Sequence, residues 1–293
     1  MEVIMSSYVL FTDLSCDIEP ELLKEWDVEF LSLKHYFIDE PEKEYTNLTY
    51  PVKQFYDEMR SGRVSKTAAI DIESFVTAFK GILESGKDIL YLAFSSGLSS
   101  TYSNSVIAAE QVAPLFPDRI ILISDTRSAS AGMGLLVYLT AMKKREGATI
   151  EEAFEFAEEQ KFHLCHWFTV SDLVYLKRGG RVSAAAAFFG GVLGIKPVLH
   201  MDDPGHLIPM MKVKGRKNSL LKLADKYGEL SIDPAGGTVF ISHGDCIEDA
   251  QALANILNER YGAKVSVITY VGPVIGAHSG PGTLALFFLG KER

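Results

Sequence analysis

Three segments of the chain combine residue types that could bind an anion, and the first covers residues 94–101 (FSSGLSST). Its serines Ser95, Ser96 and Ser99 stand between an apolar run and a segment with helical character. Unpaired N–H groups and the helix dipole make a helix start attractive to a carboxylate or a phosphate, and serine hydroxyls add donors. The same residue types also cap helices without binding any ligand, so the segment alone leaves both interpretations open.

The second segment is a glycine-rich turn at residues 276–283 (GAHSGPGT), which contains His278 and Gly280. Three glycines in eight residues indicate tight backbone geometry or the close approach of another group. His278 is expected to act there as a hydrogen-bond donor or a proton carrier. A single histidine can also be purely structural.

The third segment (KRGGRVS, residues 177–183) places Arg178 and Arg181 around a pair of glycines. Arginine can bind a carboxylate or phosphate through two parallel hydrogen bonds, or it can contact a partner protein. Solvated arginines at a helix end are the structural alternative. Thr67, in a short polar stretch with Lys66, is similarly ambiguous on its own.

Other chemistries find less support in the sequence. The run His163-Leu-Cys165-His166 offers three metal ligands, but a strand would direct His166 to the face opposite His163 and Cys165. Because no second ligand cluster completes such a site, we expect no metal and no cofactor. The chain also lacks the glycine-rich lysine loop that holds ATP phosphates, so ATP is expected to bind elsewhere.

A serine esterase or acyl hydrolase is the enzymatic alternative. Ser99, Asp125 and His278 follow one another in the chain order of the α/β-hydrolase triad. The sequence around Ser99 lacks the second glycine of the usual nucleophile motif.

Apolar, strand-like runs alternate with helix-length amphipathic segments, as at residues 88–94, 102–112, 119–124 and 128–143. This alternation predicts α/β architecture with mostly parallel sheets and helices on both faces. The length of 293 residues suits two domains with a ligand cleft between them. Thr149 and Glu152 form the pattern of a capping box at the start of a helix. We place the domain boundary after this helix, which gives domains at residues 1–161 and 162–293.

Composition limits the location and the partners. The net charge is −9 and basic residues do not cluster, so nucleic acid is not an expected partner. The first residues lack the features of a signal peptide, and the longest apolar run, residues 184–195, is too short to span a bilayer. Together with three widely spaced cysteines, this predicts a soluble cytoplasmic protein that does not span the membrane.

Six motifs occur in one order along nearly the whole chain: Thr67 in a Lys-Thr loop, SSGLS-x-TY at 95–102, Asp125-Thr with Ser128 and Gly132, RGGRVS at 178–183, IKPVL from Ile195, and HSGPGT from His278. Together they resemble the DegV family. The resemblance implies a long-chain fatty acid buried between two α/β domains. In some members it also implies the binding subunit of bacterial fatty acid kinase, whose separate ATP-using subunit phosphorylates the bound carboxylate.

The resemblance also assigns residues to the site. It implies carboxylate contacts from Thr67, the serines at 95, 96 and 99, His278 and Gly280, and partner or phosphate contacts from Arg178 and Arg181. The chain departs from the family at residues 68–71 (AAID), where many members have Ser-Gln-Pro-Ser, and at Ser100, where glycine is usual. These departures concern the head-group geometry.

A carrier of this kind is physically reasonable, because burying an acyl chain is favourable by about 0.8 kcal/mol per CH2. The carboxylate needs hydrogen-bond donors once it leaves water, and hydroxyl, amide and imidazole groups would supply them. We therefore expect a lipid-binding protein and not an enzyme acting alone. The candidate tunnel residues are Ile70, Phe94, Phe188, Phe189, Leu193 and Phe287.

Overall fold

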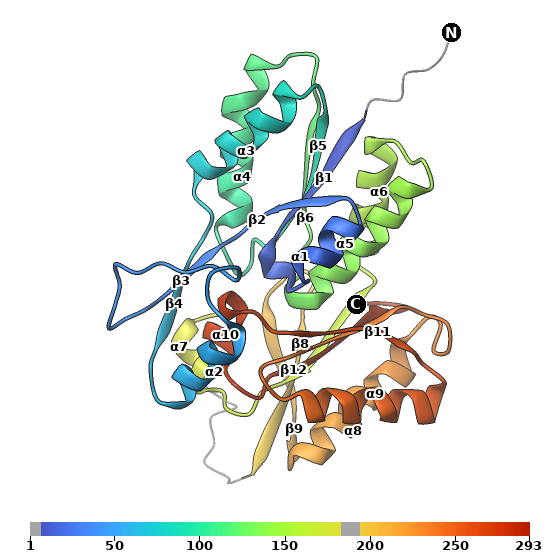
Figure 1. Ribbon diagram of the computed structural model, residues 1–293. Helices are drawn as coiled ribbons and strands as arrows, with labels where there is room; N and C mark the ends of the chain where they lie inside the picture. Colours follow the sequence, from blue (N-terminus) through green and yellow to red (C-terminus); the bar gives the residue numbers. More distant parts are fainter. Residues whose placement is uncertain (1–6, 183–193) are drawn as a thin grey trace.

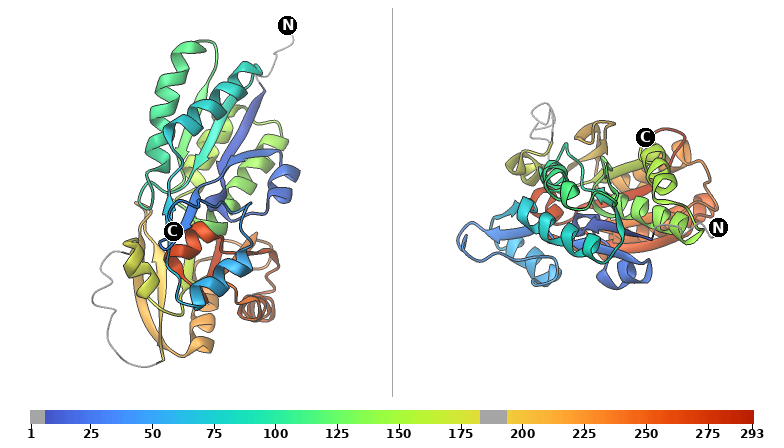
Figure 2. Two further views of the ribbon diagram at one scale, coloured as in Figure 1. Left: turned by 60° about the vertical axis from the view of Figure 1, so that its left-hand side comes forward. Right: turned by 90° about the horizontal axis from the view of Figure 1, so that it is seen from above.

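The computed structural model describes residues 7–182 and 194–293, which form two α/β units stacked along the long axis of the molecule (Figures 1 and 2). The upper unit in Figure 1 contains a four-stranded sheet in the order β2-β1-β5-β6. Its strands are β1 (Tyr8–Asp13), β2 (Val28–Leu31), β5 (Asp88–Ala93) and β6 (Ile121–Asp125), and all pairings are parallel. Every residue of β1 and β5 is buried, as expected of central strands covered on both faces.

Helices cover both faces of this sheet, as the sequence predicted (Figure 1). On one face lie α3 (Ile72–Glu84) and α4 (Thr101–Val112). On the other lie α1 (Pro20–Glu25), α5 (Ser130–Arg145) and α6 (Ile150–Gln160). The predicted capping box at the start of α6 is present, because Thr149 and Glu152 each accept a hydrogen bond from the other's backbone N–H.

The second unit contains a six-stranded sheet in the order β11-β10-β12-β7-β8-β9. The strands are β7 (Leu164–Thr169), β8 (Ile195–Met201), β9 (Leu207–Lys214), β10 (Val239–His243), β11 (Val265–Tyr270) and β12 (Leu284–Leu289). Helices α8 (Arg216–Leu230) and α9 (Ile247–Tyr261) cover one face, and α5 of the first unit packs against β7, β10 and β12.

Strand pairing in this second sheet differs from the expectation of mostly parallel sheets, although the α/β class is confirmed. Among the strands that the structure describes, only β10 and β11 pair in parallel there. The reason lies in the connections, since a parallel pair needs a long crossover and α9 supplies one between β10 and β11. The hairpin β8–β9, predicted from its Asp202–Gly205 turn, closes through a short loop and must be antiparallel.

One segment of the N-terminal half packs against the second unit. Strands β3 (Lys34–Phe37) and β4 (Ser65–Ala68) form a two-stranded ribbon, which together with α2 (Val52–Arg60) contacts α10 (Pro273–Ser279). Phe37, Phe55 and Tyr56 bury Ala277 of α10 in a small cluster of their own. This contact carries β4, and therefore Thr67, to the junction of the two units (Figure 1). The division of the chain at residue 161 remains a prediction.

Candidate functional site

A cavity of about 260 Å³ lies where the two units meet. The first unit contributes the loop after β5, the start of α5, and β4. The second contributes β7, α10, β12 and the short helix α7 (Val174–Gly179). The wall is mainly apolar, and its apolar residues are Leu33, Ala69, Phe94, Leu98, Ala129, Phe168, Leu176, Met201, Leu207, Val271, Val274, Ile275, Ala285 and Phe287.

Strand β12 shows how the sequence produces this wall. Successive side chains of a strand point to opposite faces of the sheet. Thr283, at the entry to the strand, and then Ala285 and Phe287 line the cavity. Leu284, Leu286 and Phe288 pack on the other face, in the core beneath α8 and α9. The continuous apolar run therefore divides between the cavity and a conventional core.

The structure brings Thr67 and His278 together in the cavity wall. The Oγ1 atom of Thr67 lies 2.8 Å from Nε2 of His278, although the two residues are 211 positions apart. Burial, with a smaller effect from the positive charge of Arg181, lowers the pKa of His278 to about 4. The imidazole is therefore neutral near pH 7, and its buried Nδ1 has no hydrogen-bond partner among the described residues.

Two glycines allow the packing that fixes His278. A Cβ atom on Gly179, at the end of α7, would overlap with Nδ1 of the His278 ring. A Cβ atom on Gly280, directly after α10, would overlap with the ring of Tyr175 in α7. The helices α7 and α10 thus interlock, each placing a ring against a glycine at the end of the other. Gly280 supports the site in this way and is not part of the cavity wall.

Further hydroxyl groups surround the Thr67–His278 pair. Ser99 lines the cavity and its Oγ lies 2.9 Å from Oγ1 of Thr101. Ser279 is 5% exposed, lines the cavity, and its hydroxyl has no partner among the described residues. Sequence reasoning singled out His278 in this motif and missed Ser279, although both belong to the same glycine-rich turn. Ser279 is a free donor beside the cavity.

Ser95 and Ser96, also predicted to contact a ligand, lie outside the cavity wall. The Ser95 hydroxyl donates to the carbonyl oxygen of Gly205 at 2.9 Å. The Ser96 hydroxyl donates to Oδ2 of Asp125 at 2.6 Å, and its backbone N–H donates to Oδ1. Consecutive residues of this turn point in different directions, so the later serines of the segment face the cavity and the earlier two do not.

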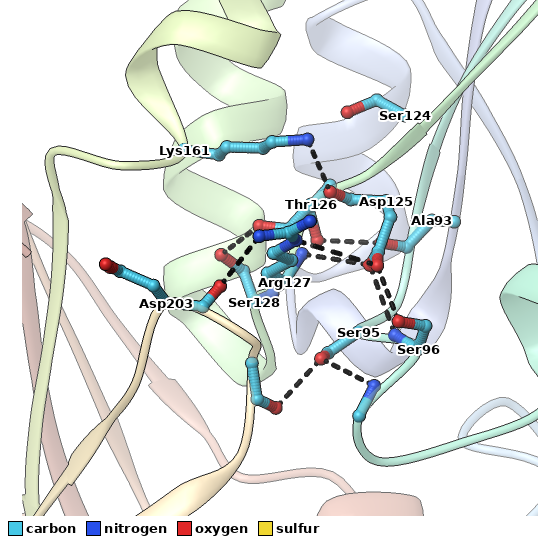
Figure 3. A network of polar contacts seen from close by, with 12 residues as sticks. Ala93, Ser95, Ser96, Ser124, Asp125, Thr126, Arg127, Ser128, Lys161 and Asp203 are labelled. Carbon is cyan, nitrogen blue, oxygen red and sulfur yellow. Dashed lines mark hydrogen bonds and ion pairs between the residues drawn. The ribbon is translucent and has the colours of Figure 1, made fainter.

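The network in Figure 3 joins the two units beside the cavity. Arg127 donates from Nη1 to the carbonyl oxygen of Asp203 at 3.2 Å, and Lys161 donates to that of Asp125 at 3.1 Å. The bonds from Ser95 and Arg127 hold the turn of the β8–β9 hairpin against the loops after β5 and β6, whereas the Lys161 bond lies within the first unit. Ser95 therefore helps to hold the two units together, whereas Ser96 bonds to Asp125 within the first unit.

The two predicted arginines occupy different positions. Arg181 lines the cavity while remaining solvent-exposed, and its Nε donates to the carbonyl oxygen of Leu98 at 3.3 Å. Arg178 is exposed, and its guanidinium lies 5.7 Å from the ring centroid of Tyr175. Arg181 thus marks the mouth of the cavity, and Arg178 lies on the adjoining surface.

The catalytic triad of the esterase alternative is not assembled. Within the part of the chain that the structure describes, no hydrogen bond joins Ser99 to His278 or His278 to Asp125. Asp125 is occupied by Ser96 and by the backbone N–H of Arg127. The chain order of the three residues was a coincidence, because their side chains bond to other groups.

The remaining predictions concern the tunnel, metal ions and membrane spans. Phe94 and Phe287 line the cavity, whereas Ile70 is buried in the core outside its wall. Phe188, Phe189 and Leu193 lie outside the described residues. Across residues 7–182 and 194–293, no three His, Cys, Asp or Glu side chains are grouped as metal ligands. No helix in these ranges is long and apolar enough to cross a membrane.

Fold and site together define a class: an α/β protein whose two units enclose an apolar cavity with a hydroxyl–imidazole pair in its wall. The model of a family described as "Uncharacterised protein, DegV family" matches residues 7–291. The chain is also 44% identical to a DegV domain-containing protein of Clostridium perfringens, with 99% of each chain covered. This protein belongs to the DegV family.

Solved structures of similar proteins have the same fold. One is described as a DegV lipid binding protein from Thermotoga maritima (29% identity, TM-score 0.86, covering 98% of this chain and 99% of that one). A second protein of that organism is reported to reveal fatty acid binding function (28% identity, TM-score 0.83, 97% and 99% covered). A third is described as DegV, a fatty acid binding protein from Bacillus subtilis (25% identity, TM-score 0.82, 98% and 100% covered).

Proposed function

We propose that this protein binds one long-chain fatty acid in the cavity between its two units, with the carboxylate against Thr67, Ser99 and His278. The observation that carries the proposal is the 2.8 Å contact between Thr67 and His278 in the wall of a mainly apolar cavity. The descriptions of the related Thermotoga maritima and Bacillus subtilis proteins support the same class of ligand.

The chemistry of the wall suits both parts of such a ligand. Each buried CH2 group contributes about 0.8 kcal/mol, so the apolar wall provides the affinity. A carboxylate buried here would require donors, and the hydroxyls of Thr67, Ser99 and Ser279 can supply them. A neutral His278 carries one ring N–H, and when this is the Nε2–H it donates to Oγ1 of Thr67 and leaves the Thr67 proton for the carboxylate.

We further propose that the protein is a carrier that presents the carboxylate to a separate ATP-using kinase subunit. Arg181 supports this proposal because it lies at the cavity wall and is also solvent-exposed, so a partner could reach the head group beside it. Exposed Arg178 would extend the contact surface. A partner that uses ATP would meet this protein in the cytoplasm. Phosphorylation of the bound acid only when the kinase subunit is added would test this role.

Binding itself is tested by denaturing the purified protein and identifying the released molecules by mass spectrometry. The expected result is about one fatty acid per chain. Thr67→Val removes the hydroxyl while keeping the side-chain shape, and it should weaken binding by about tenfold, as loss of one hydrogen bond to a charged group would. Ser96→Ala is the matched control because Ser96 lies outside the cavity. Lipid-free protein that binds no added fatty acid would overturn the proposal.

A further inference from the structure

A second group of polar side chains lies in the cavity wall, apart from Thr67 and His278. Ser130 and Ser242 both line the cavity, and their hydroxyl oxygens are 2.9 Å apart. Ser130 also donates to Oδ2 of Asp17 at 2.6 Å, and Oδ1 of Asp17 accepts from the backbone N–H of Gly272 at 3.0 Å. The exposed fractions of Asp17, Ser130 and Ser242 are 6%, 5% and 0%. We call these three side chains the inner polar group.

The inner polar group and His278 are held near opposite ends of α10. Gly272, which bonds to Asp17, directly precedes α10, whereas His278 is near the end of that helix. A helix of seven residues is about 10 Å long. Strand β12 indicates the same separation of the two polar groups, because Ser242 pairs with Ala285, which lies two residues further along the chain than Thr283. A ligand whose head group lies at His278 would therefore pass the inner polar group partway along its chain.

The hydrogen-bond valences of the inner polar group are incomplete. While Asp17 is ionised, the Ser130 proton is used in the bond to Asp17 and the contact between Ser130 and Ser242 uses the Ser242 proton, so the Ser242 oxygen receives no donor from the bonds among the described residues. When Asp17 is protonated, its carboxyl can donate to Ser130 and Ser130 to Ser242, so the Ser242 proton faces the cavity and meets no acceptor among the described residues. An unbranched hydrocarbon chain would leave this buried hydroxyl with Ser130 as its only hydrogen-bond partner among the described residues.

The kind of group that fits is restricted by Asp17. A second carboxylate would face the carboxyl of Asp17 through Ser130, which disfavours a dicarboxylic acid. A keto oxygen only accepts, so it matches Ser242 only in the order in which the Ser242 proton faces the cavity. A hydroxyl both donates and accepts. A hydroxyl on the ligand therefore matches Ser242 in either direction of hydrogen-bond donation between Asp17, Ser130 and Ser242.

We propose that the preferred ligand is a long-chain fatty acid with one hydroxyl partway along its chain, bound by Ser242 and Ser130. This inference depends on the proposed fatty acid binding and specifies its ligand. Ser242 and Ser130 then select the chain, while Thr67 and His278 hold its carboxylate.

The test compares the affinities of octadecanoic acid and its positional monohydroxy isomers for delipidated wild-type protein in a competition assay. We expect one isomer to bind at least about tenfold more tightly than the unsubstituted acid, which corresponds to about 1.4 kcal/mol. Ser242→Ala and Ser130→Ala should each reduce this preference, because each removes a hydroxyl from the cavity wall. Wild-type protein that binds the unsubstituted acid at least as tightly as every isomer would overturn the inference while leaving the proposed function intact.

Thr269→Val is the matched control. Thr269 donates to the carbonyl oxygen of Asp17 at 2.9 Å, but it is not part of the cavity wall. This substitution disturbs the surroundings of Asp17 and should leave the preference for the hydroxylated isomer unchanged. A preference that survives both serine substitutions, or that Thr269→Val removes equally, would show that the inner polar group only joins the two units. Failure of every acid to bind would overturn the proposed function as well.

Discussion

The imidazole of His278 packs directly against the Cα atom of Gly179, in a space that any side chain at position 179 would fill. Gly179 ends α7 and belongs to the motif that contains Arg178 and Arg181. The motif therefore does more than present two arginines. It provides a surface without a side chain that holds the ring in contact with Thr67.

Gly179→Ala is expected to displace His278 and to weaken fatty acid binding by about tenfold or more, because the contact with Thr67 would be lost. The measurement is the affinity of the delipidated protein for a fluorescent fatty acid. Gly180→Ala is the control, since no atom lies within 4 Å of a Cβ at position 180, although its positive φ of 66° makes alanine unfavourable by about 1 kcal/mol. Equal losses of affinity in the two variants would contradict this role of Gly179.

Gly205→Ala should destabilise the junction between the two units. A Cβ at position 205 would overlap with the Ser95 hydroxyl, and Gly205 also has a positive φ of 86°. Gly62→Ala has the same kind of backbone penalty, with a φ of 100°, but meets no atom within 4 Å. We expect the loss in free energy of unfolding to be about 1–3 kcal/mol larger for Gly205→Ala, measured by urea denaturation. Similar losses of unfolding free energy in the two variants would mean that the β8–β9 turn accommodates the added methyl group without a packing cost.

The parts of the fold that follow from local sequence could be predicted. The apolar run at residues 88–94 forms a buried strand because both faces of the parallel sheet are covered. Thr149 and Glu152 mark the start of α6 because both capping partners are close in sequence. The position of β12 between β10 and β7 could not be predicted, since strand order depends on contacts between distant segments.

The same distinction applies to the site. Thr67 was assigned to the site through resemblance to a family and His278 also from its glycine-rich turn, and their contact confirms only that they are neighbours. Residue type could not distinguish Ser95 from Ser99, because the direction of a side chain in a turn depends on the backbone path. Ser130 and Ser242 gave no signal, since two ordinary serines 112 positions apart become a pair only in the folded chain.

His35 should make stability depend on pH. Its ring is surrounded by Phe37, Tyr45, Tyr50 and Phe55, and burial lowers its pKa from 6.5 to about 4. Between these values the unfolded chain binds a proton that the folded protein does not, so the free energy of unfolding rises with pH.

In His35→Phe the slope of unfolding free energy against pH should fall by about one proton between pH 4 and 6.5. The ring contacts would be largely kept, which limits the change at neutral pH to about 1.5 kcal/mol. Urea denaturation at several pH values measures this slope. An unchanged slope would mean that His35 is protonated equally in the folded and unfolded states.

Asp17 should have the opposite effect on stability. Burial raises its pKa from 3.8 to about 8, against the smaller opposing effects of hydrogen bonds from Ser130 and Gly272. Between these values the folded protein keeps a proton that the unfolded chain has released, so the contribution of Asp17 to stability falls as pH rises. Asp17→Asn removes this penalty, and the variant should exceed wild type in free energy of unfolding at pH 7.5 by a few kcal/mol, with a smaller difference at pH 5.

Asp13→Asn is an informative comparison, because burial also raises the pKa of Asp13. Both Asp13 oxygens accept bonds from fixed N–H donors, those of Ser15 and Phe94, so an amide NH2 would face a donor and destabilise the protein.

In Asp17→Asn the amide can instead donate to the Ser130 oxygen while its own oxygen keeps the bond from Gly272. The Ser130 proton would then turn to Ser242 and the Ser242 proton to the cavity. Protonated Asp17 allows the same proton order, so we expect wild type to prefer the hydroxy acid over its keto analogue only above about pH 8, where Asp17 is ionised, and Asp17→Asn to bind both acids about equally at every pH in the same competition assay. Identical ranking of the two acids by both proteins above about pH 8 would show that the proton order of the inner polar group does not affect ligand choice.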